Sequence, residues 1–311
     1  MSNSPESTNA LVCGVDGAHE VANRGVLLTG CGRTGTSVLG RVLASSRNVV
    51  YDYEPPILTA LLAIGPSLSR DHFRFLWSTY VTQQLSIDAL AGRGLNLNHH
   101  DESSAFSYME PGEIRSRLSR SASIHDLIST LALVVPLIKI PDVVSRLACL
   151  FTAYPQIRVV VTGRDPSAVI RSVALKGWFE NEARHTNPRQ GDVLTGLPFW
   201  LDPNLGERFS VASPLDRAAI YYIAMHDQAL QYQGIHLLSY QRLVSNPEEA
   251  AEWLEAKLGL KPGPRTNSVV STIKNTQVNT ATDVLSSVSI DIRRTAEATW
   301  EAWSAAEVTG H

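Results

Sequence analysis

Residues 25–37 read GVLLTGCGRTGTS, and this stretch decides how the rest of the chain is interpreted. Its first half is a short apolar run typical of a buried strand. Its second half holds three glycines followed by two hydroxyl residues, Thr36 and Ser37. A glycine-containing turn that leads into a helix presents backbone N–H groups and the positive end of the helix dipole to an anion. The stretch therefore predicts a strand, a phosphate-binding loop and a helix. The alternative is an ordinary strand-to-helix turn with a capping threonine.

Four further apolar runs resemble the strand expected at 25–30, and they lie at 48–53, 136–140, 157–163 and 235–240. Helix-like segments alternate with the strands, at 36–46, 141–153, 166–176, 214–232 and 247–258. Strands that are apolar on both faces and alternate with helices indicate a parallel sheet covered on both sides. We therefore expect an α/β fold, a P-loop-like parallel sheet flanked by helices, with ligands bound at the carboxyl ends of the strands.

The chain is expected to form a single α/β domain over residues 25–311, preceded by a flexible N-terminal arm at residues 1–24. Its 311 residues are 44% hydrophobic and 18% charged, which is ordinary for a globular protein. An insert at about residues 56–135 separates the second and third strands and has helix-like patches at 57–64, 71–91 and 121–134. A second irregular segment spans 177–213. Long segments beside an α/β core are commonly lids or walls of a substrate site.

Composition excludes several classes of function. The formal net charge of −3 gives no basic footprint, so we expect no nucleic-acid partner. Three scattered cysteines, Cys13, Cys31 and Cys149, are too few for a disulfide framework or a zinc site and fit a reduced cytosol. No stretch approaches the roughly 20 apolar residues of a membrane span, and the N-terminus does not resemble a signal peptide. We expect a cytoplasmic protein.

The loop differs from that of kinases and GTPases at one position. Those loops place a lysine directly after the second glycine, where it reaches the β- and γ-phosphates, whereas Thr36 stands there in this chain. The cation of the loop is instead Arg33, two residues before Gly35. This pattern resembles the 5′-phosphosulfate loop of sulfotransferases, and the matching residues are Arg33, Thr34, Gly35, Thr36 and Ser37.

A second motif follows the fourth expected strand. Residues 159–172 read VVVTGRDPSAVIRS and resemble the 3′-phosphate motif of the same family, with Arg164 closing the strand and Ser172 on the next helix. An arginine fork and a hydroxyl two helical turns later can converge on one phosphate, and Pro166 suits the first turn of a helix. Without the first motif, the favoured interpretation of this segment would be a surface pair of Arg164 and Asp165 with a solvated serine.

Two longer segments extend the resemblance. Residues 137–161, LIKIPDVVSRLACLFTAYPQIRVVV, match the family's run of a strand ending in lysine, a proline, a helix and the 3′-phosphate strand. Residues 237–260, LLSYQRLVSNPEEAAEWLEAKLGL, match its later strand and helix. The resemblance covers 25–53 and 136–260 in the family's order. The chain is identified as a member of the PAPS-dependent sulfotransferases, where PAPS is 3′-phosphoadenosine 5′-phosphosulfate, and it resembles bacterial and carbohydrate-type members more than cytosolic members with a histidine base.

The resemblance implies that the sulfonyl group of PAPS is transferred to a hydroxyl, or an amine, of a glycan or small specialised metabolite, with no metal. The insert is then expected to cover the acceptor side. The resemblance also assigns donor binding, and the residues concerned are Gly32, Arg33, Thr34, Gly35, Thr36, Ser37, Arg164, Ser172 and Tyr240. Arg33 would also meet the bridge oxygen of the breaking bond. Tyr240 would lie near adenine, although a core tyrosine is the alternative.

Departures from the family pattern bear on the catalytic base. Val38 replaces a stacking tryptophan that many cytosolic members have, and Pro141 stands where those members have the catalytic histidine. Lys139 is retained and is expected beside the transferring sulfonyl group. Glu54, in the segment YDYEPP, matches a glutamate that serves as base in carbohydrate and bacterial members, with Asp52 as a reserve candidate. The alternative for Glu54 is a loop-edge carboxylate held by arginine or backbone donors.

Other functions and residues stay open at this point. A P-loop phosphotransferase is opposed by Thr36 and by the lack of a clear magnesium-binding aspartate after a strand, and a non-catalytic nucleotide-binding protein would not need Glu54. A homodimer is neither indicated nor excluded. His99 and His100 fit a solvated loop better than a catalytic pair. Several aromatic residues could stack on the acceptor or belong to the core, namely Trp77, Trp178, Phe179, Phe199 and Trp200.

Overall fold

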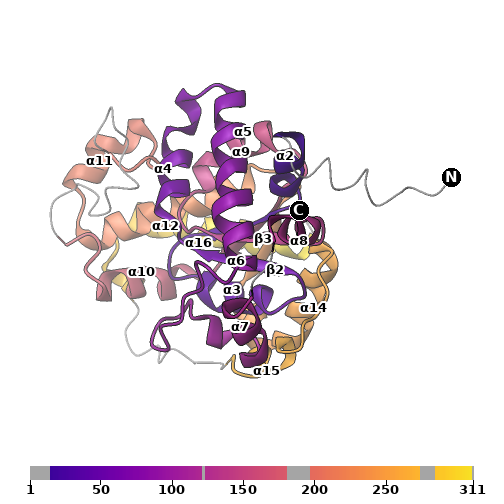
Figure 1. Cartoon of the computed structure of the whole chain (residues 1–311). Coiled ribbons are helices and arrows are strands. Elements are labelled where there is room, and N and C mark those ends of the chain that lie inside the picture. Colours follow the sequence, from indigo (N-terminus) through magenta and orange to yellow (C-terminus); the bar gives the residue numbers. More distant parts are fainter. Residues whose placement is uncertain (1–14, 121–122, 181–196, 274–283, 310–311) are drawn as a thin grey trace.

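A computed structural model of the protein describes residues 15–120, 123–180, 197–273 and 284–309 (Figure 1). A five-stranded parallel sheet lies at its centre, in the order β2-β3-β1-β4-β5. The strands are β1 (Val26–Gly30), β2 (Val49–Tyr53), β3 (Val135–Lys139), β4 (Arg158–Gly163) and β5 (His236–Ser239). All five expected strands are present within a residue or two of their predicted bounds. The α/β class with a parallel sheet is therefore confirmed.

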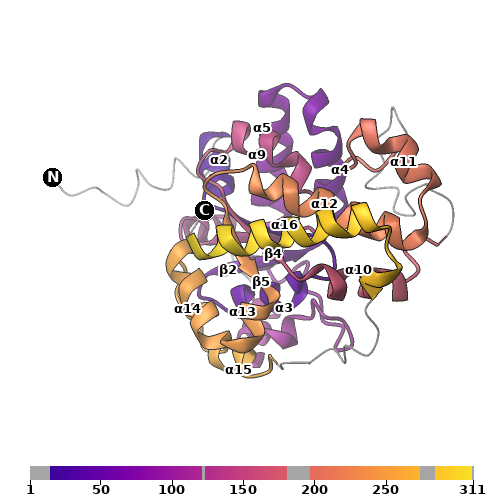
Figure 2. The same ribbon diagram turned by 180° about the vertical axis from the view of Figure 1, so that it is seen from behind.

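Helices cover both faces of the sheet. One face carries α2 (Val15–Asn23), α4 (Pro56–Ile64), α5 (Arg70–Thr79), α8 (Ile124–Leu131), α9 (Leu147–Ala153), α10 (Pro166–Leu175), α12 (Pro214–Leu230) and α16 (Ile290–Thr309). The other face carries α3 (Thr36–Ala44), α7 (Pro111–Leu118), α13 (Tyr240–Ser245) and α14 (Pro247–Leu258), with α15 (Thr266–Val270) against α3 and α14. Figure 2 shows the long α16 crossing the back of the molecule alongside α12.

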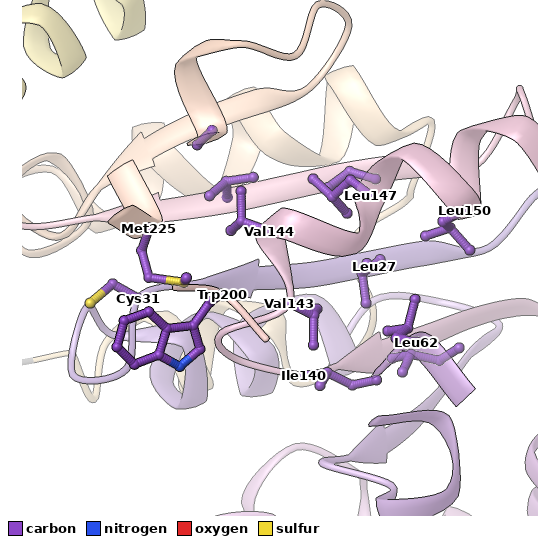
Figure 3. Packing of buried hydrophobic residues seen from close by; sticks show 14 of the residues in the cluster. Leu27, Cys31, Leu62, Ile140, Val143, Val144, Leu147, Leu150, Trp200 and Met225 are labelled. Carbon is purple, nitrogen blue, oxygen red and sulfur yellow. The ribbon is translucent and has the colours of Figure 1, made fainter. Parts of the chain in front are cut away.

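Strand β1 shows how the sequence builds the two core layers. Successive side chains of a strand point to opposite faces. Leu27 accordingly joins the apolar cluster on the α9 and α12 side, whereas Val26 and Leu28 join the cluster on the α3 and α14 side. Figure 3 shows part of the first layer, with Leu27 of β1, Leu62 of α4 and Leu147 of α9 in one cluster. Because both faces are buried, β1 reads as a continuous apolar run.

The expected helices are present, but two differ in extent. The helix predicted for 141–153 begins later than expected. A 3-10 turn, Val144–Arg146, comes first, and α9 follows it from Leu147 to Ala153. Pro141 restricts the chain here, and Asp142 takes a left-handed φ of 64°, which a helix cannot contain. The patch at 71–91 is α5, a π-helical stretch (Tyr80–Ile87) and α6 (Asp88–Leu90) in succession. The remaining short elements are η1 (Gly65–Ser67), η3 (Ala105–Ser107), η5 (Pro203–Leu205), α11 (Gly206–Val211) and η6 (Val284–Ser287).

Part of the predicted N-terminal arm is a packed helix. The arm was expected over residues 1–24, yet 15–23 form α2, which contacts α5. Val21 and Ala22 are fully buried there, so burial of one apolar face holds the helix in place. Residues 1–14 lie outside the described residues. Within the described ranges, no helix has the length and apolar character that crossing a membrane requires.

Candidate active site

The carboxyl ends of the central strands open onto a pocket of about 340 Å³. All the residues predicted for donor binding and catalysis line this pocket, with the exceptions of Thr34 and Ser172. They come from the loop between β1 and α3, the ends of β2, β3 and β4, and the start of α13. Parallel strands therefore bring together residues that are more than 200 positions apart, at the edge where α/β sheets bind ligands.

The loop between β1 and α3 has the backbone of an anion-binding turn. Three of its residues have positive φ, namely Gly30 (137°), Arg33 (72°) and Gly35 (92°). A Cβ at Gly35 would lie 2.5 Å from the ring of Tyr240, so only glycine fits there. Gly35 is also the N-cap of α3, and no side chain of the described residues caps that end. The first N–H groups of α3 are thus left for a ligand, and the predicted alternative of a threonine cap is wrong.

Thr34 faces the protein interior. Its side chain is fully buried, its hydroxyl donates to the carbonyl of Cys31, and it lies 2.6 Å from the hydroxyl of Thr162 in β4. These contacts fasten the loop to the neighbouring strand. The predicted place of Thr34 in the phosphate cradle therefore does not extend to its side chain. The hydroxyl of Ser37, by contrast, lies 3.3 Å from that of Tyr53 and lines the pocket.

Arg33 and Ser172 join the two predicted phosphate motifs. Nε of Arg33 donates to Oγ of Ser172 at 2.9 Å, so the loop touches α10 directly. Ser172 itself does not line the pocket but supports the arginine that does. The two motifs were predicted as separate halves of one donor site, and they are in contact.

Arg164 lies over an aromatic ring. Its guanidinium is 4.3 Å from the ring centroid of Tyr240, and Nη1 donates to the carbonyl of Arg33 at 3.3 Å. Nε is buried and has no hydrogen-bond partner among the described residues. This donor is therefore available to a ligand or water. The alternative pairing with Asp165 is not seen, because that carboxylate caps α10 at Ala168 N and accepts from Gln241.

Glu54 and Lys139 form an ion pair at the ends of β2 and β3. The two strands are neighbours, with Tyr53 opposite Lys139, and Glu54 N donates to the carbonyl of Lys139 at 2.8 Å. Glu54 has a φ of 52°, so the chain leaves the strand direction at this residue. The lysine side chain is only 3% exposed and the glutamate side chain 31%, and Nζ lies 4.3 Å from the ring centroid of Tyr53. The partner of Glu54 is thus this lysine, not an arginine.

Sequence reasoning missed Asp142 and Tyr221, and it left the location of Trp178 undecided. Asp142 and Tyr221 hydrogen-bond to each other beneath the loop, and burial, followed by the charge of Asp142, raises the pKa of Tyr221 well above its usual value. Trp178, left open between the acceptor site and the core, lines the pocket over Gly32. The signal available for Asp142 was its position directly after Pro141. Tyr221 gave none, because it is one of two adjacent tyrosines in an amphipathic helix.

The weaker candidates lie elsewhere. Asp52 accepts from the hydroxyl of Tyr80 at 2.6 Å, and burial raises its pKa. It lines a different pocket. His99 stacks on Phe106 with ring centroids 3.9 Å apart, in an exposed loop. The remaining aromatic candidates are buried in the core, namely Trp77, Phe179, Phe199 and Trp200.

Comparison with known proteins identifies the family. Residues 25–262 match the family model described as "Sulfotransferase family". This match spans well over half of the chain, and the chain belongs to the sulfotransferase family. No match was found among curated proteins.

Several solved structures are similar to the chain. The sulfotransferase domain from the curacin biosynthetic pathway is 16% identical, with 78% of this chain and 75% of that chain covered and a TM-score of 0.43. A sulfotransferase from Alicyclobacillus acidocaldarius is 13% identical, with 91% and 95% covered and a TM-score of 0.43. A sulfotransferase from Mycobacterium tuberculosis H37Rv is 16% identical, with 96% and 81% covered and a TM-score of 0.40.

Proposed function

We propose that the protein transfers the sulfonyl group of PAPS to a hydroxyl, or an amine, of a glycan or small specialised metabolite, with Glu54 as the general base. The observation that carries this proposal is the ion pair of Glu54 and Lys139 in the same pocket as the anion-binding loop and Arg164. Membership of the sulfotransferase family supports the class of reaction. The choice of donor and base rests on the residues of the pocket.

The residues of the pocket fit a donor with two separate phosphates. The uncapped end of α3 and Arg33 suit the 5′-phosphosulfate, because uncapped backbone N–H groups and a cation belong to one loop that lines the pocket. Arg164 suits the 3′-phosphate, because its buried Nε lacks a partner among the described residues and its guanidinium is already held by Tyr240 and the carbonyl of Arg33. A donor with a single phosphate chain would leave the Nε donor of Arg164 unused. PAPS, when bound, supplies the activated sulfonyl group.

Glu54 and Lys139 then divide the chemistry between them. The acceptor oxygen forms a bond to sulfur while its proton passes to a carboxylate oxygen of Glu54. The bond between sulfur and the bridge oxygen breaks, and adenosine 3′,5′-bisphosphate leaves. Lys139 and Arg33 carry the positive charge that offsets the charge developing on the bridge oxygen and the sulfonyl group. Most of the catalysis therefore comes from positioning and charge, as in phosphoryl transfer.

The other carboxylates near the pocket are poorer bases. Asp142 is already hydrogen-bonded by Gly32 N and the hydroxyl of Tyr221, and it is 5% exposed. Glu102 belongs to an exposed loop of the insert and forms the rim. Glu54 alone of these three combines a partly exposed side chain with a place inside the pocket, at the end of a central strand. The geometry thus favours it for accepting the acceptor proton.

The test is the variant Glu54→Gln, which keeps the shape of the side chain and removes its capacity to accept a proton. We expect turnover with PAPS and an active acceptor to fall by about 10²-fold or more, the range for loss of a general base. Binding of adenosine 3′,5′-bisphosphate should change little. Glu102→Gln, the same change at the rim of the same pocket, should stay within a few-fold of wild type. Turnover of Glu54→Gln close to that of wild type would remove Glu54 from the mechanism.

A further inference from the structure

Asp142 lies beneath the loop that joins β1 to α3. It follows the end of β3 by three residues and has a φ of 64°, in the left-handed region that few residues other than glycine, asparagine and aspartate adopt. Its backbone N–H donates to the carbonyl of Gly30 at 2.9 Å. The chain after β3 is therefore tied to the last residue of β1 before any side chain is considered.

The side chain of Asp142 makes a second connection to the loop. Its Oδ1 accepts from Gly32 N at 2.9 Å and from the hydroxyl of Tyr221, which itself lies 2.6 Å from Gly32 N. Tyr221 comes from α12 and is only 1% exposed. The N–H of Gly32 is thus directed into the protein, where a carboxylate and a phenol hold it.

Packing confines Gly32 from the other side. A Cβ at this position would lie 2.8 Å from the ring of Trp178 and 2.9 Å from the hydroxyl of Tyr221. Cys31, the residue before it, is buried in the same apolar cluster as Trp200 and Met225 (Figure 3). Little room remains for the first half of the loop to move.

These contacts connect the two halves of the pocket. Only two residues separate Asp142 from Lys139, whose ammonium pairs with Glu54. We propose that Asp142 and Tyr221 are positioning residues that hold the loop of residues 31–35 in register with the pair of Glu54 and Lys139. The role rests on the proposed function, because register matters only if one side of the pocket holds the sulfonyl donor and the other activates the acceptor.

The alignment of this loop with the pair of Glu54 and Lys139 should affect the rate of transfer more than the affinity for the nucleotide. In-line transfer requires donor and acceptor groups to be aligned, and a misplacement of about 1 Å can cost about 10²-fold in rate. Asp142→Ala removes one of the two acceptors of Gly32 N and the carboxylate that accepts from the buried hydroxyl of Tyr221. The phosphate contacts proposed for Arg33 and Arg164 are not removed. We therefore expect kcat to fall by about 10- to 100-fold and binding of adenosine 3′,5′-bisphosphate to change by no more than about threefold.

Conservative variants separate positioning from simple structural support. Asp142→Asn keeps an oxygen that accepts both hydrogen bonds and tolerates the left-handed φ, so it should recover most of the lost kcat. Tyr221→Phe deletes only the hydroxyl and should lower kcat by several-fold in a protein that remains folded. Hydrogen exchange of the amides in the loop should be faster in Asp142→Ala and Tyr221→Phe than in wild type.

Two matched controls test whether any buried polar deletion has these effects. Asp216 accepts from the N–H and hydroxyl of Ser289, each at 2.8 Å, and does not line the pocket. Tyr154 is 1% exposed, and its hydroxyl donates to the carbonyl of Arg74 at 2.6 Å. Asp216→Ala and Tyr154→Phe should lower the thermal midpoint, yet leave kcat and exchange in the loop near wild type.

The outcomes distinguish this proposal from the proposed function. If wild type neither binds adenosine 3′,5′-bisphosphate nor transfers sulfonyl groups, the proposed function fails and this proposal fails with it. If wild type is active while Asp142→Ala and Tyr221→Phe match its kcat and loop exchange, only the positioning role is overturned. If Asp142→Ala does not fold, Tyr221→Phe decides, and wild-type values for that variant would refute the role.

Discussion

The variant Arg164→Ala gives the sharpest test of how the donor is held. The guanidinium is fixed by the ring of Tyr240 at 4.3 Å and by the carbonyl of Arg33 at 3.3 Å, while its buried Nε has no partner among the residues described. The arginine is thus in position before a ligand arrives. We expect the 3′-phosphate of adenosine 3′,5′-bisphosphate to accept from it.

The magnitude follows from that geometry. The ring contact and the bond to Arg33 exist without ligand, so they do not add to the binding energy but reduce the cost of ordering the side chain. The remaining gain is one charge-assisted contact, worth about 1.5–3 kcal/mol. Its loss corresponds to a rise in Kd of about 10- to 150-fold. Adenosine 5′-monophosphate lacks the 3′-phosphate, so its Kd should change by less than about threefold.

Calorimetry measures the Kd of both nucleotides for wild type and for Arg164→Ala. The four Kd values form a thermodynamic cycle in which the 3′-phosphate and Arg164 are removed separately and together. Arg242→Ala is the matched control, because Arg242 also lies over an aromatic ring, that of Trp253 at 4.5 Å, and does not line the pocket. Its nucleotide binding should equal that of wild type. An equal loss of affinity for the bisphosphate and the monophosphate in Arg164→Ala would refute the assignment of the 3′-phosphate.

Three further predictions concern the loop, the lysine and pH. Gly35→Ala combines a left-handed φ, which costs about 1–2 kcal/mol, with a Cβ placed 2.5 Å from the ring of Tyr240, so nucleotide binding should weaken at least tenfold. Gly234→Ala is the control, because φ is 76° there and the Cβ meets nothing within 4 Å. In that variant only thermal stability should fall. Lys139→Met should lower kcat by about 10²- to 10³-fold, the range for losing one charge-stabilising donor, with intact folding checked by circular dichroism. Burial lowers the pKa of His226 from 6.5 to about 4. Between these pH values the unfolded chain binds more protons than the folded chain, so the free energy of unfolding should fall by up to about 3 kcal/mol as the pH drops from 6.5 toward 4. Urea unfolding should show a flatter pH dependence in His226→Gln.

Much of the fold could be predicted because its signals are local. Each strand is a short apolar run, and α14 begins and ends where Pro247 and Gly259 indicate. Helix α16 was missed because its alternation of alanine, glutamate and arginine carries little apolar periodicity, and it is held by buried contacts such as that of Trp303. The π-helical stretch in the insert has no sequence signature either.

The residues of the candidate site could be proposed from the sequence where one motif contains the whole signal. The loop is recognisable from its own segment, Arg164 only together with the loop, and Glu54 from the proline that follows it. The pairing of Glu54 with Lys139 depends on β2 lying next to β3, which the strands alone do not determine. The contact of Asp142 with Tyr221 requires α12 to pack beneath the loop, and the inward turn of Thr34 requires β4 beside β1. Such contacts arise from tertiary structure.

The central claim is that this pocket holds a donor with a 3′-phosphate and a 5′-phosphosulfate. Titration calorimetry of the wild-type protein with adenosine 3′,5′-bisphosphate, and separately with ATP and magnesium, tests it most directly. The pocket as described predicts clear binding of the bisphosphate and binding of ATP with magnesium that is at least about tenfold weaker, the lower bound for one lost charge-assisted phosphate contact. Preference for ATP with magnesium would contradict the claim and favour a phosphotransferase.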